Sequence, residues 1–284
     1  MCSPNNNPIG IFDSGLGGLT VARAIRNAFP NEAICYLGDT ARVPYGSKSP
    51  DTVKRYARED IAFLLSRNVK VIVAACNTVS AAALPELINC YPVPVLGVVE
   101  IGAETALEDA PKKIGIIGTE TTVRSQAYVR AILKRSPETE VVQKACPLLV
   151  PLIEEGWFEH DVTRMVIEEY LAPMRDSGVN SLILGCTHYP LIRPMLQDFF
   201  GPSVRTVDSA DAMVHALNTA FNSNQIGRAN TNNSAASLYY VTDRGTHFSK
   251  LLAAFMGEND LPVEQIRCDE LTLALEKREA ESKK

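Results

Sequence analysis

The sequence lacks any apolar run close to the ~20 residues that a membrane-spanning helix needs. Its start, MCSPNNNPIG, also lacks the basic and apolar regions of a signal peptide. Positive charge is not in excess either, since 28 Lys and Arg residues against 33 Asp and Glu residues give a net charge of −5. We therefore do not expect nucleic acid or an anionic membrane as a partner. These absences predict a cytoplasmic protein and leave a small-molecule substrate open.

Two short motifs are missing as well. The seven cysteines contain no CxxC pair, which disfavours a zinc ribbon or a disulfide framework and indicates reduced thiols. In the turn from Asp13 to Gly18, which follows a predicted strand at 9–12, Thr20 stands where the last glycine of GxGxxG should be. The incomplete motif disfavours a dinucleotide site, although its glycines would let the backbone come close to a ligand.

The chain does have two similar strand ends. VKVIVAACNTVSAAAL (69–84) and SLILGCTHYPLI (181–192) each begin with a short β-branched apolar run, which leads to Cys76 or Cys186 and then to polar side chains. Each pattern predicts a strand that ends at a cysteine. Ligands of open α/β sheets lie beyond the carboxyl ends of strands, and a helix that starts there would favour a thiolate. We expect one site with a sulfur on each side.

The two cysteine segments belong to a larger repeat. KIGIIGTETTVRSQAYVRAIL has the same pattern as PIGIFDSGLGGLTVARAI, and the offset from Ile9 to Ile114 nearly equals that from Cys76 to Cys186. The length of 284 residues exceeds the ~100–200 residues usual for one domain. The sequence thus predicts an α/β protein with two similar doubly wound domains, related by pseudo-symmetry, and an active site in the cleft between them.

Two facing thiols allow several chemistries. A metal site of Cys76, Cys186 and His188 lacks a fourth ligand at useful spacing. A redox pair normally occurs as CxxC, and a single nucleophilic cysteine explains only one of the two strand ends. An acid/base pair uses both, because a thiolate can remove a proton from one face of a carbon while a thiol returns one to the other face, which inverts a stereocentre. Asp13, Glu154 and His188 are candidates for tuning the thiols.

Six motifs carry a resemblance to a known family: GIFDSGLGGLTV (10–21), VPYG (43–46), ACNT (75–78), GTETTV (118–123), GCTHYPLI (185–192) and VDSA (207–210). In this order they resemble the glutamate racemases, cofactor-independent enzymes that make D-glutamate for peptidoglycan synthesis. The related aspartate racemases are less similar, since they usually carry Glu where His188 stands. The resemblance implies that the last third of the chain completes the first domain, so that residues 1–98 plus 209–284 form one domain and residues 99–208 the other.

The resemblance also implies roles for individual residues. Cys76 and Cys186 would be the two proton-transfer residues, the first acting on D-glutamate and the second on L-glutamate, with no cofactor and no metal. Glu154 is a further catalytic candidate, although Glu155 is adjacent and only one of the two can face the cleft. Substrate contacts would come from Asp13, Ser14, Pro44, Tyr45, Gly46, Asn77, Thr78, Thr119, Thr121, Thr187 and His188.

Two other functions stay open. The cleft could hold a dicarboxylate in a binding module whose cysteines only pack, or it could belong to a nicotinamide-dependent enzyme. Loss of optical rotation from pure L-glutamate without added cofactor separates these from a racemase. The sequence does not determine whether the chain forms a homodimer, which enantiomer binds more tightly, or whether a cell-wall precursor regulates activity. It predicts a long mobile loop for the Asn-rich segment 222–237, with no role assigned.

Overall fold

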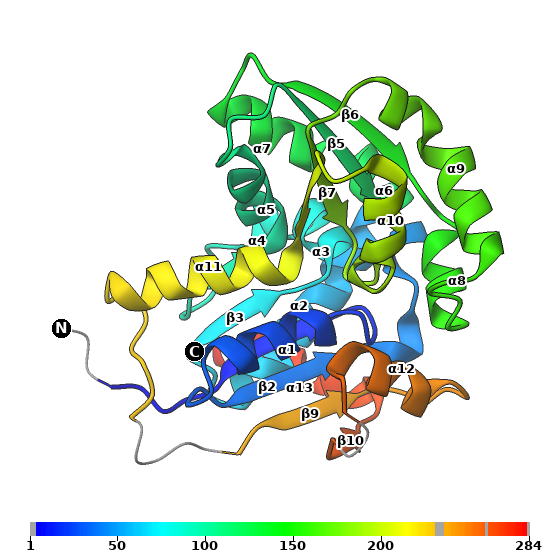
Figure 1. The fold of residues 1–284 in the computed structure, drawn as a ribbon. Helices are drawn as coiled ribbons and strands as arrows, with labels where there is room; N and C mark the ends of the chain where they lie inside the picture. The colour runs from blue at the N-terminus through cyan, green and yellow to red at the C-terminus, as the bar shows by residue number, and fades with distance from the viewer. Residues whose placement is uncertain (1–3, 231–235, 259–260, 283–284) are drawn as a thin grey trace.

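The computed structural model describes residues 4–230, 236–258 and 261–282. Its strands form two sheets (Figure 1). The first sheet has the order β10-β9-β2-β1-β3-β4, and its neighbouring strands are parallel. Its strands are β1 (Ile9–Asp13), β2 (Ile34–Gly38), β3 (Val71–Ala74), β4 (Val95–Gly97), β9 (Leu238–Val241) and β10 (Val263–Gln265).

The second sheet repeats the topology of the first. Its order, β6-β5-β7-β8, matches the β2-β1-β3-β4 part of the first sheet strand for strand, and all its neighbours are parallel. The predicted α/β class and internal repeat are therefore confirmed, with β3 and β7 as the equivalent strands that precede the two cysteines. The strands are β5 (Lys113–Gly118), β6 (Glu140–Ala145), β7 (Ser181–Gly185) and β8 (Arg205–Asp208).

Helices cover both faces of the first sheet. Side chains alternate along β1, so Ile9 and Ile11 pack with α1, α11 and α12, while Phe12 packs on the other face with α2 and α13. The longer helices are α1 (Leu19–Ala28), α2 (Pro50–Ser66), α5 (Val98–Leu107), α7 (Ala127–Arg135), α9 (Asp161–Asp176), α10 (Arg193–Phe200), α11 (Ser209–Asn222), α12 (Phe248–Met256) and α13 (Cys268–Glu281).

Short helices follow several strand ends and shape the loops there. Thr119 begins one of them, because its hydroxyl oxygen accepts from the N–H of Thr122 at 3.2 Å. The same kind of cap starts α2, where Ser49 accepts from the N–H of Thr52 just ahead of Pro50. The short helices are α3 (Asn77–Ala82), α4 (Leu84–Leu87), α6 (Glu120–Arg124), α8 (Leu149–Glu154) and the 3₁₀ helices η1 (Thr40–Arg42), η2 (Tyr45–Ser47) and η3 (Tyr189–Ile192).

The chain passes between the two sheets at β4–α5 and at β8–α11. Helices α5 and α11 contact each other, and α11 also contacts α1 beside the first sheet (Figure 1). The side chain of Asp208 fixes the start of α11 by accepting from the N–H groups of Ala210 and Asp211 at 2.8 and 2.9 Å. We propose that the domain boundaries lie after residues 98 and 208.

Some details differ from the sequence-based expectations. No α-helix starts directly after Cys186, because 3₁₀ helix η3 comes first and α10 begins only at Arg193. The edge strand β10 has only three residues, two of them polar and exposed, so it carried no apolar signal. Of the Asn-rich segment, residue 222 belongs to α11, and residues 231–235 lie outside the described residues. No helix in the described parts of the chain is long and apolar enough to cross a membrane.

Candidate active site

One cavity of about 290 Å³ lies where strands of both sheets end. It collects residues that follow β1, β2, β3, β5, β6 and β7, which is where parallel sheets place ligands. Both cysteines singled out by the sequence reach this cavity, one from each sheet. The lining residues are Ser14, Val43, Pro44, Tyr45, Gly46, Ser47, Cys76, Asn77, Thr78, Thr119, Glu120, Cys146, Pro147, Val150, Pro151, Glu154, Gly185, Cys186, Thr187 and His188.

Cys76 lies two residues after β3 and forms the N-cap of α3. Its side chain is almost fully buried, and its Sγ donates to Ser14 Oγ at 3.5 Å. Burial, together with the nearby carboxylate of Asp13, raises the pKa of Cys76 to about 12, although the interactions with Ser14 and with the backbone of Val79 act in the opposite direction. The expectation of a thiolate at this helix start is therefore wrong, because a thiol with this pKa carries its proton near neutral pH.

Cys186 directly follows β7 and has a cationic neighbour instead. Its Sγ lies 3.8 Å from His188 Nδ1, and His188 Nε2 lies 3.1 Å from Glu154 Oε1. Burial lowers the pKa of His188, but the interactions with Cys186 and Glu154 outweigh it and raise the pKa to about 10. An imidazolium beside a sulfur stabilises negative charge on that sulfur. The two thiols thus have different surroundings, a carboxylate near Cys76 and a cation near Cys186.

Glu154, rather than Glu155, faces the cavity. Glu154 sits at the end of α8 and reaches His188, whereas the carboxylate of Glu155 lies 4.0 Å from His247 and its carbonyl accepts from Lys250. The alternative between the two residues, which the sequence left open, is resolved by these different contacts.

Asp13 and Thr121 lie behind the cavity surface. Asp13 is fully buried, accepts from the N–H of Gly15 at 2.9 Å and lies 3.4 Å from the hydroxyl of Thr187; burial raises its pKa. Thr121 donates its hydroxyl to the carbonyl of Gly46 at 2.7 Å. Both residues are among the predicted substrate contacts, but in this structure they support lining residues instead.

The amide of Asn77 is already paired. Its Nδ2 donates to Ser209 Oγ at 3.0 Å, and its Oδ1 accepts from the hydroxyl of Tyr128 at 2.6 Å. The next residue, Thr78, shares a hydrogen bond of 3.0 Å with the hydroxyl of Thr119. These polar groups after β3 therefore bind groups that belong to the second sheet's helices and to α11, so they hold the two sides of the cavity together.

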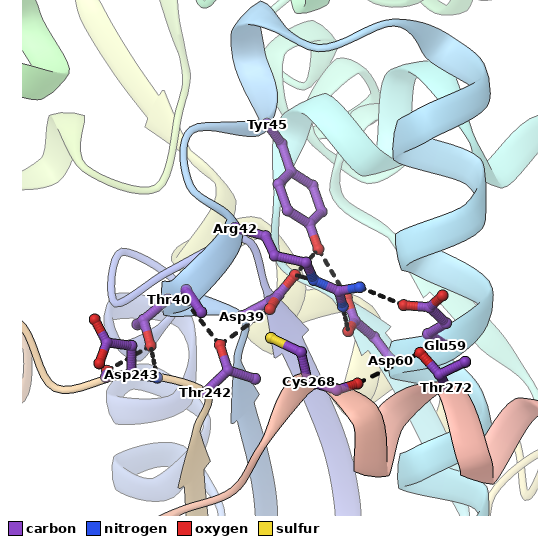
Figure 2. A network of polar contacts seen from close by, with 11 residues as sticks. Asp39, Thr40, Arg42, Tyr45, Glu59, Asp60, Thr242, Asp243, Cys268 and Thr272 are labelled. Atoms are coloured by element: carbon purple, nitrogen blue, oxygen red, sulfur yellow. Dashed lines mark hydrogen bonds and ion pairs between the residues drawn. The ribbon is translucent and has the colours of Figure 1, made fainter.

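The loop 43–47 supplies another side of the cavity. Gly46 faces Thr119 so closely that an added Cβ would lie 2.8 Å from the Thr119 Cβ. Tyr45 also lines the cavity, and its hydroxyl points toward Asp39 and Asp60 (Figure 2). A contact between that hydroxyl and substrate is not available in this arrangement.

Comparison with known proteins adds to this geometry. Residues 18–217 match the Asp/Glu/Hydantoin racemase family. The chain belongs to this family. A glutamate racemase from Syntrophus aciditrophicus is 46% identical over 268 residues, which cover 93% of this chain and 98% of that protein.

Solved structures of the racemase family share the whole fold. Glutamate racemase from Francisella tularensis in complex with D-glutamate has a TM-score of 0.85 and 35% identity, covering 93% of this chain and 98% of that one. Glutamate racemase from Thermus thermophilus in complex with beta-chloro-D-alanine has a TM-score of 0.84 and 40% identity, covering 94% and 100%. The two-domain α/β racemase fold predicted from the motifs is confirmed.

Sequence reasoning missed part of the cavity of this racemase. Cys146 and Pro147 follow β6 just as the two cysteines follow β3 and β7, so the strand-end rule applied to this strand would have found them. Val43, Val150 and Pro151 carry no polar group that could have marked them. Cys146 is fully buried, its Sγ donates to the carbonyl of Lys144 at 3.7 Å, and burial raises its pKa to about 12.

The sequence left open a metal site formed by Cys76, Cys186 and His188. Within residues 4–230, 236–258 and 261–282, no group of three or more His, Cys, Asp or Glu side chains is arranged to hold a metal ion. Cys186 and His188 instead contact each other, and His188 uses its second ring nitrogen on Glu154.

The raised pKa of His188 predicts a pH-dependent stability. Because its pKa rises from 6.5 to about 10 on folding, its stabilising effect is complete below about pH 6.5 and is lost as the pH rises through about 10. We expect this loss to be on the order of 2 kcal/mol, reduced by solvent screening because Glu154 is 41% exposed. Buried thiols such as Cys76 and Cys146, whose pKa values are raised to about 12, lower the stability of any variant above about pH 9. Urea unfolding with reduced thiols at about pH 6 and about pH 10 should therefore show a loss in the parent protein that exceeds the loss in His188→Gln by the contribution of His188.

Proposed function

We propose that this racemase interconverts L- and D-glutamate, with Cys76 and Cys186 as its two proton-transfer residues. The observation that carries the proposal is that equivalent strands of two topologically matching sheets each deliver one cysteine to the same cavity. The relatives named above support glutamate as the substrate, since both the sequence relative and the two solved structures are glutamate racemases.

The proposed reaction moves two protons and leaves no net change in the enzyme's proton count. For L-glutamate, the thiolate of Cys186 takes the α-proton and becomes a thiol, and the electron pair stays on the α-carbon. Cys76 then gives its proton to the opposite face and becomes a thiolate. The surroundings suit these roles, because His188 stabilises a negative sulfur at Cys186 while burial and Asp13 keep Cys76 protonated. The D-enantiomer follows the same steps in reverse.

The cavity offers neutral donors for two carboxylates. Ser14, Thr78, Thr119 and Thr187 bring hydroxyl groups, and none of the described residues that line the cavity is Lys or Arg. Glu120 contributes a carboxylate that suits the substrate ammonium. In this proposal the product D-glutamate serves peptidoglycan synthesis in the cytoplasm, as the motif resemblance implies.

The proposal predicts racemisation without any added cofactor. Dialysed protein with a metal chelator should convert pure L-glutamate into a mixture of enantiomers, as measured by chiral chromatography. L-aspartate should react far more slowly. A binding module would leave L-glutamate unchanged, and a nicotinamide-dependent enzyme would need added cofactor. Activity that disappears with chelator and returns with zinc would move a metal mechanism to first place.

A further inference from the structure

A buried polar network lies beneath the cavity loop 43–47. It is formed by Asp39 at the end of β2, Arg42 in η1, and Glu59 and Asp60 on α2, with the hydroxyl of Tyr45 at its centre (Figure 2). None of these residues except Tyr45 lines the cavity. The network therefore lies outside the chemistry described above, but it contacts the loop that forms one side of the site.

Arg42 connects the three carboxylates. Its Nε lies 2.5 Å from Asp39 and one terminal nitrogen lies 3.4 Å from Asp60, while the other pairs with Glu59. The guanidinium also lies 4.0 Å from the ring centre of Tyr56. The carboxylates of Asp39 and Asp60 are fully buried, so these contacts are little screened by water.

Tyr45 joins this network to the loop. Its hydroxyl hydrogen-bonds Asp39 and lies 3.3 Å from Asp60 Oδ2. One hydroxyl has a single proton, so a second hydrogen bond requires a proton on Asp60. Burial and the neighbouring Asp39 raise the pKa of Asp60 well above its usual value, which is consistent with a protonated acid there. One guanidinium then faces two carboxylates instead of three.

Hydrogen bonds from residues that follow β9 also hold this network in place. Thr242, directly after β9, donates its hydroxyl to Asp39 at 3.0 Å and accepts from the N–H of Ala41 at 2.8 Å. Thr40 and Asp243 exchange two further hydrogen bonds, of 2.6 and 2.7 Å. The loop that follows is thus held at its base from β2, β9 and α2, while its tip meets the second sheet's loop at Gly46 and Thr121.

We propose that Arg42 and the side chains of Asp39, Glu59 and Asp60 are positioning residues that hold loop 43–47 in its substrate-binding conformation through the hydroxyl of Tyr45. This inference rests on the proposed glutamate racemase function for its kinetic consequence. If the loop loses its support, only a fraction of molecules has a complete cavity, and the apparent affinity falls by that fraction. Substrate at saturating concentration selects the complete cavity again, so turnover is largely retained.

The main test compares Arg42→Met with Arg58→Met. Both variants remove an arginine ion pair near α2, but Arg58 pairs with Glu279 at the exposed surface, 2.6 Å away. We expect Arg42→Met to raise KM for glutamate about tenfold while kcat changes less than about threefold, and Arg58→Met to leave both constants unchanged. A merely structural role for Arg42 would lower the active fraction, and hence the apparent kcat, without raising KM.

Two milder variants cover the case in which Arg42→Met does not fold. Tyr45→Phe keeps the ring and removes only the hydroxyl, so it should raise KM with little loss of melting temperature. Asp60→Asn tests the protonated form of Asp60, since a neutral amide of the same shape should then keep KM within about twofold of the parent. Asp39→Asn removes a charge that Arg42 needs, so it should raise KM like Arg42→Met.

Hydrogen exchange of residues 40–48 tests the network without substrate. In the parent protein the N–H groups of Ala41, Arg42 and Lys48 are hydrogen-bonded, and Arg42→Met and Tyr45→Phe should speed their exchange about tenfold or more. Unchanged exchange and unchanged KM in these folded variants would overturn the positioning role. If the parent failed to racemise glutamate, the proposed function would fall, while the exchange rates would still decide the role of the network.

Discussion

Cys186→Ala should stop the interconversion of glutamate enantiomers, with kcat lower by about 10³-fold or more, because it removes the sulfur that takes or gives the proton on that side of the cavity. Cys76 and its partner Ser14 stay in place. If Cys76 acts on the D-enantiomer, it can still remove the α-proton of D-glutamate and return one to the same face. D-glutamate in heavy water should then slowly gain deuterium without becoming L-glutamate.

Cys76→Ala should give the mirror result, with exchange of L-glutamate only. The two variants should not be equally fast. The remaining Cys186 keeps its cationic neighbour His188, whereas the remaining Cys76 has a pKa raised to about 12 and must first lose its proton. We therefore expect single-face exchange to be faster in Cys76→Ala than in Cys186→Ala near neutral pH.

Loss of the α-proton signal by NMR, beside chiral chromatography, measures exchange and inversion separately. Cys90→Ala is the matched control, because Cys90 is an exposed free cysteine outside the cavity. It should racemise at the parent rate. If either cavity variant also did so, a one-base mechanism or another catalytic group would have to replace the two cysteines.

Local sequence patterns predicted the strands that precede the two cavity cysteines. Strands β3 and β7 are short apolar runs that are buried along their whole length, which is the pattern that parallel strands covered on both faces show in a sequence. Cys76 and Cys186 lie within two residues of the ends of these strands, so each is placed at the carboxyl edge of its sheet. That is why the two cysteines and the polar residues directly after them could be found without a structure.

Contacts between distant segments could not be predicted in the same way. The family resemblance implied that Tyr45 contacts substrate. Tyr45 does line the cavity, but its hydroxyl hydrogen-bonds Asp39 and lies 3.3 Å from Asp60, on a helix further along the chain. Asp13 likewise has its hydroxyl partner in Thr187, at the end of the other sheet. The periodicity of apolar residues predicts which face of a helix or strand is buried, but it does not predict which side chain from another element packs against that face.

The sequence predicted a close approach to the backbone at the glycines of the turn 13–18, but it did not predict that side chains of the protein would approach Gly17. The glycines of the first turn were expected to admit a ligand, whereas a Cβ on Gly17 would lie 2.5 Å from His188 Nδ1 and would also collide with the hydroxyl of Thr187. Hydrogen bonds restrict any movement of the turn away from these side chains. The hydroxyl of Thr20 lies within hydrogen-bond distance of two carbonyls, that of Gly17 and, at 3.2 Å, that of Thr187. One methyl group added here must push against the residues beside Cys186.

Gly17→Ala should therefore lower kcat/KM about 10²-fold, since a misplacement of catalytic groups by about 1 Å costs that much, while the fold loses only about 1–3 kcal/mol from overpacking. Gly245→Ala is the matched control, because a Cβ there meets nothing within 4 Å, and its activity should equal that of the parent. Steady-state kinetics beside urea unfolding separate the two effects. The displaced His188 should also lose its contact with Cys186, so the stability loss between about pH 6 and about pH 10 should shrink in Gly17→Ala. Parent-like activity in this variant would mean that Thr187 and His188 can move aside without harm, and that their present positions do not matter for catalysis.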